Sequence, residues 1–331
     1  MSRRWPVLLA VLLQIGAVAA IVVDKEWTLH RGRELVVQTA PIDPRDIFRG
    51  DYVRLNYLFS RIPAGRVDPA LLHGGLRKGE RLWLAMRPAS GGVAVAARVQ
   101  RQKPEFPYLR GRVVADWPVK KTPGDGQVTE SLRLDFGIGR YYVEQGRGRV
   151  LEQIRGRRDD FQRAMRVRLA VAGNGEALIR DFDWADLSVR TSILSTPEAD
   201  APDERASAVI RLSLRNETDH PVTLGLRPDG CSFDLIPAGA FSGPVELLSE
   251  ERAVFCAGRE PVPHRVEPQG ILDIDIDFNQ PEWWATVDGE LKPLGRLPWP
   301  YRWRLVYREP LPAGLRGRIL SRAFHPGGQV D

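Results

Sequence analysis

The chain has 331 residues, of which 43% are hydrophobic and 27% are charged, and this balance excludes a disordered or fibrous protein. Only two cysteines are present, which excludes a small scaffold held together by many disulfides. The formal net charge is +6, but the arginines alternate with acidic and apolar residues, so we do not expect nucleic acid as a partner. The length leaves room for two folded domains.

An apolar segment opens the chain. Residues 5–23 carry no charge, and their number is close to the ~20 residues that cross a bilayer as a helix. Arg3 and Arg4 precede this segment, so the positive-inside rule places the N-terminus in the cytoplasm. Everything after Asp24 is then expected outside the cytoplasm.

A cleaved signal peptide is the alternative to a permanent anchor. Residues 17–19, Ala-Val-Ala, have the small-x-small form of a cleavage site. The apolar run nevertheless continues through residues 21–23, which favours an uncleaved helix. We therefore predict a single-pass anchor over residues 1–26.

Residues 41–59, PIDPRDIFRGDYVRLNYLF, join a charged turn to a strand. Pro44 and Gly50 favour a rigid loop that ends in a tight turn. In residues 52–57, apolar and polar side chains then alternate with the period of two that a half-buried strand requires. The charged residues of the segment are Asp43, Arg45, Asp46, Arg49, Asp51 and Arg54.

The sequence GDYVRLNY resembles the motif of the GDYXXLXY proteins, a bacterial family of undefined function. Its named positions are filled by Gly50, Asp51, Tyr52, Leu55 and Tyr57. Residues 136–146, FGIGRYYVEQG, resemble the family's second landmark, a strand followed by a turn of the Y-x-x-E-G type. The resemblance covers about 190 residues, the usual extent of one domain. It implies a polytopic integral membrane protein as partner, since relatives are often encoded beside one.

Two interpretations of the motif loop remain open. Charged residues in a turn commonly bond to backbone groups and to each other, and Asp51 would then bind amides of its own turn. Alternatively the loop and strand form an edge that recognises a partner, with Arg54 pointing away from the buried face. The residues of this candidate site are Asp43, Arg45, Asp46, Arg49, Gly50, Asp51, Tyr52, Arg54, Leu55 and Tyr57.

Residues 27–190 are predicted to form a β-rich domain with one short helix at residues 148–163. The sequence Gly173-Asn174-Gly175 between two strands predicts a tight hairpin. The predicted strands cover residues 34–40, 52–57, 81–86, 92–99, 108–115, 132–138, 165–171 and 177–182.

Residues 191–207 are polar and contain two prolines, as expected of a linker. Beyond them, residues 208–331 show several short alternating runs separated by turns. This pattern predicts an immunoglobulin-like β-sandwich and makes the fold class mainly β. Later strands of this domain are expected at residues 245–248, 253–256, 271–278 and 301–307.

The two cysteines, Cys231 and Cys256, both lie in this second domain. An even pair in an oxidising compartment predicts one disulfide, worth roughly 3 kcal/mol of stability in the chain-entropy model. A metal site is the alternative, but no cysteine or histidine spacing supports it. We therefore assign neither a metal nor a cofactor.

Two clusters in the second domain each have a functional and a structural interpretation. The aromatic side chains near the C-terminus could bind a sugar or a partner, or they could fill the sandwich core. Carboxylates that alternate along one strand could hold calcium, or they could form a solvated face. The residues concerned are Trp283, Trp284, Trp299, Tyr301, Trp303 and Tyr307, and Asp273, Asp275 and Asp277.

The sequence therefore predicts a membrane-anchored, extracytoplasmic accessory protein that binds a polytopic membrane protein. No catalytic residue is assigned, because no activated nucleophile or acid–base pair is recognisable. An envelope hydrolase that uses the motif-loop carboxylates is the second hypothesis. The third is a module that binds glycans or lipid headgroups.

Overall fold

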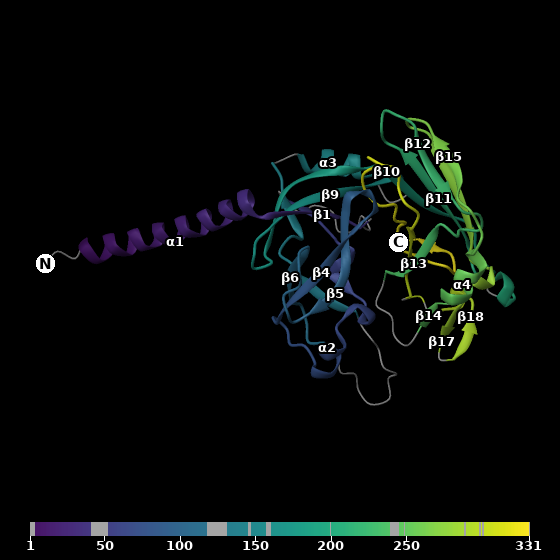
Figure 1. Cartoon of the computed structure of the whole chain (residues 1–331), viewed down its shortest axis with the longest axis horizontal. Coiled ribbons are helices and arrows are strands. Elements are labelled where there is room, and N and C mark those ends of the chain that lie inside the picture. The colour runs from purple at the N-terminus through teal and green to yellow at the C-terminus, as the bar shows by residue number, and fades with distance from the viewer. Residues whose placement is uncertain are drawn as a thin grey trace.

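The computed structural model shows a single helix that projects from two adjacent β-rich domains (Figure 1). The fold is mainly β, with several antiparallel sheets and few helices, as predicted. The residues that the structure describes are 4–40, 52–117, 131–144, 147–156, 160–198, 200–238, 245–247, 249–287, 289–297, 299 and 301–330.

The projecting helix, α1 (Arg4–Arg31), forms because residues 5–23 are apolar and contain no proline beyond the first turn. It is long and apolar enough to cross a membrane, and none of its most apolar window is buried against the protein. A membrane anchor and a signal sequence both have this form. The helix continues past its apolar run and ends at Arg31, beyond the predicted end of the anchor at residue 26.

The last turns of α1 dock on the hairpin between β9 (Gln162–Val171) and β10 (Ala177–Ser195). The Nη2 atom of Arg180 donates a hydrogen bond to the carbonyl oxygen of Leu29 at 2.5 Å. The ammonium of Lys25 lies 3.5 Å from a carboxylate oxygen of Glu176 in the hairpin. These contacts hold the helix against the N-terminal domain.

Two antiparallel sheets enclose the core of the N-terminal domain (Figure 1). In the first sheet, β1 (Arg33–Gln38) pairs with β9, and β9 pairs with β10. The strands of the second sheet are β3 (Arg61–Ile62), β4 (Arg81–Ala89), β5 (Val93–Gln100), β6 (Tyr108–Val113) and β7 (Leu132–Asp135). Their spatial order is β3-β7-β6-β4-β5.

Alternation along the strands decides which side chains fill this core. In β4, Leu82, Leu84 and Met86 are buried, while the residues between them face outward. The predicted hairpin turn also forms, and Gly175 has a φ of +84°. A Cβ atom at Gly175 would lie 2.5 Å from the ring of Trp83, so only glycine fits at this position.

The two short helices of this domain are α2 (Pro69–Gly74) and α3 (Arg147–Arg155). The predicted helix over residues 148–163 is too long, because α3 ends before Gly156. Gly156 has a φ of +86°, the left-handed conformation that commonly ends a helix. Residues 162 and 163 then belong to β9.

Strand β10 has 19 residues and runs through both domains. Its first half pairs with β9, and its second half pairs with β11 (Val209–Asn216), from Leu187 opposite Asn216 to Ser195 opposite Val209. Residues 191–195, predicted to begin a linker, instead continue this strand. They read Thr-Ser-Ile-Leu-Ser, and the first proline follows only at Pro197, so nothing in them interrupts a strand.

The C-terminal domain consists of short antiparallel sheets around a second core. Its further strands are β12 (Val222–Leu226), β13 (Phe233–Pro237), β14 (Val245–Leu247), β15 (Val262–Val266), β16 (Ile271–Asp277), β17 (Ala285–Val287), β18 (Glu290–Lys292), β19 (Trp303–Tyr307), β20 (Phe324–His325) and β21 (Gln329–Val330). Strand β16 pairs with β11 and extends the sheet that begins with β1. The immunoglobulin-like arrangement of these strands stays a prediction.

One predicted strand of this domain is a helix. The apolar run at residues 253–256 ends α4 (Ser249–Cys256), because four apolar residues fit either structure and the preceding Glu250 and Glu251 favour the first turn of a helix. Cys256 ends the helix and is bonded to Cys231, with an S–S distance of 1.94 Å. The predicted pairing of the two cysteines is therefore confirmed.

The tryptophans and carboxylates of the C-terminal domain have structural partners. Trp283 and Trp303 are each only 2% exposed and lie in the core, whereas Trp299 is 57% exposed. On β16, Asp275 accepts hydrogen bonds from Arg211 at 2.7 and 2.8 Å, and Asp273 accepts one from the hydroxyl of Ser213 at 2.6 Å. These carboxylates therefore take part in pairs across the sheet.

Candidate functional site

The motif loop lies outside the described residues. This applies to Asp43, Arg45, Asp46, Arg49, Gly50 and Asp51, and also to the side chain of Tyr52. The roles predicted for the loop therefore stay predictions, and so does the hydrolase hypothesis that depends on its carboxylates. The structure does describe the rest of the motif, from the backbone of Tyr52 to Tyr57.

The motif strand β2 (Tyr52–Arg54) and the residues after it alternate between buried and exposed positions. The exposed fractions of Val53, Leu55 and Tyr57 are 1%, 4% and 5%, and these side chains belong to the domain core. The side chain of Arg54 is exposed. The motif's apolar positions therefore anchor the strand, and Arg54 points away from the core.

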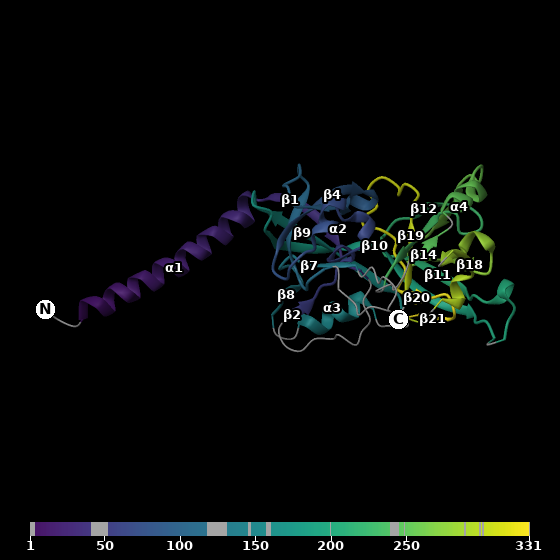
Figure 2. The same ribbon diagram turned by 90° about the horizontal axis from the view of Figure 1, so that it is seen from below.

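Strand β2 pairs with β8 (Arg140–Tyr142), which lies in the second family landmark. Val53 lies opposite Tyr141, and the amide of Leu55 donates to the carbonyl oxygen of Gly139 at 2.9 Å. Figure 2 shows β2 and β8 side by side near α3, on the half of the molecule that α1 enters. Two segments more than 80 residues apart therefore form one ribbon.

Tyr57, the last motif residue, ties this ribbon to the core. Its hydroxyl donates to the carbonyl oxygen of Ile138 at 3.2 Å, and its ring stacks on Phe59 with the centroids 4.9 Å apart. Phe59 meets the edge of Phe136 at 5.4 Å. Burial raises the pKa of Tyr57 far above its ordinary value, so the hydroxyl stays protonated.

The outward face of the β2–β8 ribbon carries side chains that the motif alone does not reveal. Arg54 lies directly opposite Arg140, and both are exposed. Tyr142, which is 69% exposed, follows on the same face. Arginine and tyrosine are enriched at the energetic centres of protein interfaces. Only the strand pairing could identify Arg140 and Tyr142, because they lie far from the motif in the sequence.

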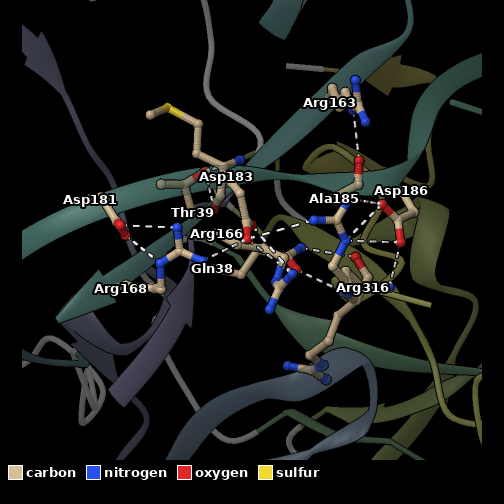
Figure 3. Close-up of polar contacts among 12 residues, drawn as sticks. Gln38, Thr39, Arg163, Arg166, Arg168, Asp181, Asp183, Ala185, Asp186 and Arg316 are labelled. Atoms are coloured by element: carbon tan, nitrogen blue, oxygen red, sulfur yellow. Dashed lines mark hydrogen bonds and ion pairs between the residues drawn. The ribbon is translucent and has the colours of Figure 1, made fainter. Parts of the chain in front are cut away.

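A second polar cluster lies where the two domains meet (Figure 3). Arg166 and Arg168 of β9 face Asp181 and Asp183 of β10 across the strand pair. The Nη2 atom of Arg168 donates to Asp181 at 3.0 Å, and Arg166 lies 3.3 Å from Asp183. Burial lowers the pKa of the Arg166 guanidinium, and nearby Asp183 opposes that effect.

Arg316 joins this cluster from the C-terminal segment of the chain (Figure 3). Its Nη2 atom donates to Asp186 at 2.8 Å, and its backbone amide donates to the other carboxylate oxygen at 2.8 Å. The amide of Asp186 donates in return to the carbonyl oxygen of Arg316 at 2.9 Å. The hydrogen bonds to Asp186 raise the pKa of Arg316.

The segment beside Arg316 extends this attachment to β1. Gln38 exchanges two hydrogen bonds with the backbone of Arg318, at 2.6 and 2.9 Å. The three carboxylates of the cluster, Asp181, Asp183 and Asp186, all lie against arginine side chains. This arrangement is suited to fixing the domains together, because each charge has a partner. Over the described ranges, no three histidine, cysteine or carboxylate side chains gather as a metal site would require.

The sequence profile of the GDYXXLXY protein family matches residues 14–182, which is just over half of the chain. The chain belongs to the GDYXXLXY family. The match begins within α1 and includes the β2–β8 ribbon (the motif ribbon) and the turn between β9 and β10, and it ends where β10 approaches the C-terminal domain. No curated protein and no solved structure matches the chain.

We expect Tyr57→Phe to lower the free energy of unfolding by about 1 kcal/mol near pH 8, because the hydrogen bond to Ile138 is lost while the ring remains. Since the pKa of Tyr57 is raised above 10.0 in the folded protein, only the unfolded wild type releases this proton just above pH 10. The wild type therefore loses about 1.4 kcal/mol per pH unit relative to the variant above that point.

Denaturant titrations of the detergent-solubilised protein, from about pH 8 to about pH 11, measure this difference. Tyr142→Phe is the control, because Tyr142 is exposed and its substitution should change stability by less than about 0.5 kcal/mol. A difference between wild type and Tyr57→Phe that stays constant over the whole pH range contradicts the prediction.

We expect Asp186→Ala to lower the free energy of unfolding by about 2–3 kcal/mol, because the guanidinium of Arg316 loses a buried, charged partner and the backbone amide of Arg316 loses its acceptor. Chemical denaturation measures the loss. The control is Asp219→Ala, whose fully exposed carboxylate contacts only His220 among the described residues. If Asp186→Asn and Arg316→Gln act additively in a double-mutant cycle, the two side chains are not coupled.

Proposed function

We propose that this GDYXXLXY-family protein is an accessory protein of the bacterial envelope that binds a polytopic integral membrane protein. In this proposal α1 anchors it in the inner membrane, with the N-terminus in the cytoplasm. Both domains lie in the periplasm, and the C-terminal one is an immunoglobulin-like module. The observation that carries the proposal is the exposed face of Arg54, Arg140 and Tyr142 on the family's motif ribbon.

The anchor and its orientation have independent support. All apolar side chains of α1 before Asp24 are exposed, which an aqueous environment would not favour. Arg3 and Arg4 precede the helix and favour a cytoplasmic N-terminus. The Cys231–Cys256 disulfide agrees with a C-terminal domain in an oxidising compartment.

The motif ribbon supports recognition because its buried residues and its exposed residues have separate roles. The buried residues Val53, Leu55 and Tyr57 hold the strand in place, so the outward residues can change without loss of the core. Arg54 and Arg140 lie directly opposite each other, and both side chains are exposed. Exposed guanidinium groups on a strand that is fixed by the core can form paired hydrogen bonds with carboxylates of a partner.

We expect a reporter enzyme that works only outside the cytoplasm to be active when fused after Asp331. A reporter that works only in the cytoplasm should be inactive at the same position. The same two reporters fused before Met1 should show the opposite pattern, which makes that fusion the matched control. Cytoplasmic activity of the C-terminal fusion would overturn the proposed orientation.

We expect the double variants Arg45→Ala with Arg54→Ala, and Arg54→Ala with Tyr142→Ala, to lose a membrane partner that co-purifies with the wild type in detergent. The loss should be at least about tenfold, since truncation of interface hot spots typically costs more than 1.4 kcal/mol. Quantitative mass spectrometry of the purified complexes measures it.

Arg205→Ala with Arg265→Ala is the control, because both arginines are exposed on the C-terminal domain. The variants should keep their thermal stability, as surface substitutions usually do. A folded Arg54/Tyr142 variant that retains its partner at the wild-type level would refute the role of the ribbon.

A further inference from the structure

The outer face of the β3-β7-β6-β4-β5 sheet carries four exposed arginines in adjacent strands. Alternation buries Leu82, Val113 and Leu134 on the inner face, so the intervening positions face outward. We call this row the arginine stripe. It consists of Arg61 on β3, Arg133 on β7, Arg112 on β6 and Arg81 on β4.

The strand register sets these arginines opposite each other in two separate pairs. Arg61 faces Arg133, and Arg81 faces Arg112. Side chains opposite each other in a sheet have Cβ atoms about 5 Å apart, and like charges at that spacing destabilise the pair. Two such pairs in one face oppose folding, so the stability of the domain does not account for them.

One carboxylate, that of Asp135, lies within the stripe, but over the described residues no guanidinium group of the stripe forms an ion pair with it. None of its four side chains makes an ion pair or a hydrogen bond there. Asp135 lies opposite Arg112, but its carboxylate accepts a hydrogen bond from the amide of Gly137 at 2.9 Å. Neighbouring Glu80 is paired with Arg101 at 3.1 Å. The stripe is thus open to an external anion.

The stripe begins next to the end of α1. Arg110, two residues before Arg112 on the same face of β6, lies 3.4 Å from Glu176. Glu176 also contacts Lys25, which comes two residues after the apolar run of α1. Figure 1 places β6 on the side of the domain that α1 enters. A helix that spans a bilayer up to Val23 therefore brings this face to the headgroups.

Aromatic residues near the contact between α1 and β6 also favour a position at the headgroup region of the membrane. Trp27 on α1 is 64% exposed just beyond the apolar run. Trp83, opposite Arg110 in the sheet, lies under the ammonium of Lys103, 5.8 Å from the ring centroid. Tryptophan with basic neighbours is typical of the interface between membrane and water.

We propose that the arginine stripe binds the phosphates of anionic phospholipids in the bilayer that α1 spans. Guanidinium groups bind phosphate oxygens through paired hydrogen bonds, and a row of headgroups supplies anions along the whole stripe. This contact relieves the repulsion between the facing arginines and holds the domain against the membrane. The inference rests on α1 as the proposed anchor and does not require the proposed protein partner.

The test uses the full-length protein in mixed detergent micelles that contain tail-labelled phosphatidylglycerol or phosphatidylcholine with the same acyl chains. We expect the wild type to retain phosphatidylglycerol preferentially, and added salt to weaken this preference. Each arginine near an anionic surface contributes about fivefold in binding. The double variants Arg81→Gln with Arg112→Gln, and Arg61→Gln with Arg133→Gln, should each lower the preference at least about tenfold.

Three comparisons make the outcome decisive. Arg205→Gln with Arg265→Gln removes the same charge from the distant C-terminal domain and should keep the preference. Arg81→Lys with Arg112→Lys keeps the charge and should retain most of it. Thermal melting should show the stripe variants to be at least as stable as the wild type, because they relieve the facing charges.

The inference is overturned if the wild type does not prefer phosphatidylglycerol, or if the control loses the preference as fully as the stripe variants do. It is also overturned if the stripe variants keep the lipid preference and lose the co-purifying protein instead, which would make the stripe a protein interface. The proposed protein complex is tested by the Arg54 and Tyr142 variants instead, so a negative result for one proposal does not refute the other.

Discussion

The arrangement of both domains depends on one strand, β10, which is hydrogen-bonded to β9 in the first domain and to β11 in the second. A strand paired on this pattern cannot bend freely, because its backbone groups would lose their partners. Asp186 lies in the break in the β9 register between Trp184 and Ser188, immediately before β10 begins to pair with β11 at Leu187. There Arg316, 130 residues away in the chain, closes the junction through its side chain and its backbone. The C-terminal segment is thus part of the attachment between the domains.

The same strand connects the domains to α1. The β9–β10 hairpin receives the last turns of the helix through Arg180 and Glu176. The orientation of the helix is therefore transmitted through β10 to the C-terminal domain. This geometry lets surfaces of the N-terminal domain hold defined positions relative to a membrane, and both proposed contact surfaces, the motif ribbon and the arginine stripe, belong to that domain. The family match covers this same part of the chain.

Facing arginines recur in this domain, as Arg54 with Arg140, Arg61 with Arg133 and Arg81 with Arg112. Other arginines of the chain pair with carboxylates, as Arg211 with Asp275 and Arg168 with Asp181 show. The contrast distinguishes two uses of arginine. In these pairs a carboxylate lies opposite the guanidinium, whereas in the three facing pairs a second arginine does. Burial of apolar side chains in the core beneath, such as the fully buried Leu82, Leu84 and Leu109, offsets the repulsion between the facing arginines.

The sequence by itself determined the features that depend on neighbouring residues. The charge-free run specifies the helix α1, and the alternation after Tyr52 specifies which face of the motif strand is buried. The residues Gly173-Asn174-Gly175 specify the hairpin turn. Only the tertiary structure decided the length of β10, the helical state of residues 253–256, and the partners of Val53 and Asp186. A short apolar run suits a helix or a strand equally, and local periodicity does not encode which distant segment will supply the partner. The arginine stripe is invisible in the sequence for the same reason, because its residues become neighbours only when four strands pair.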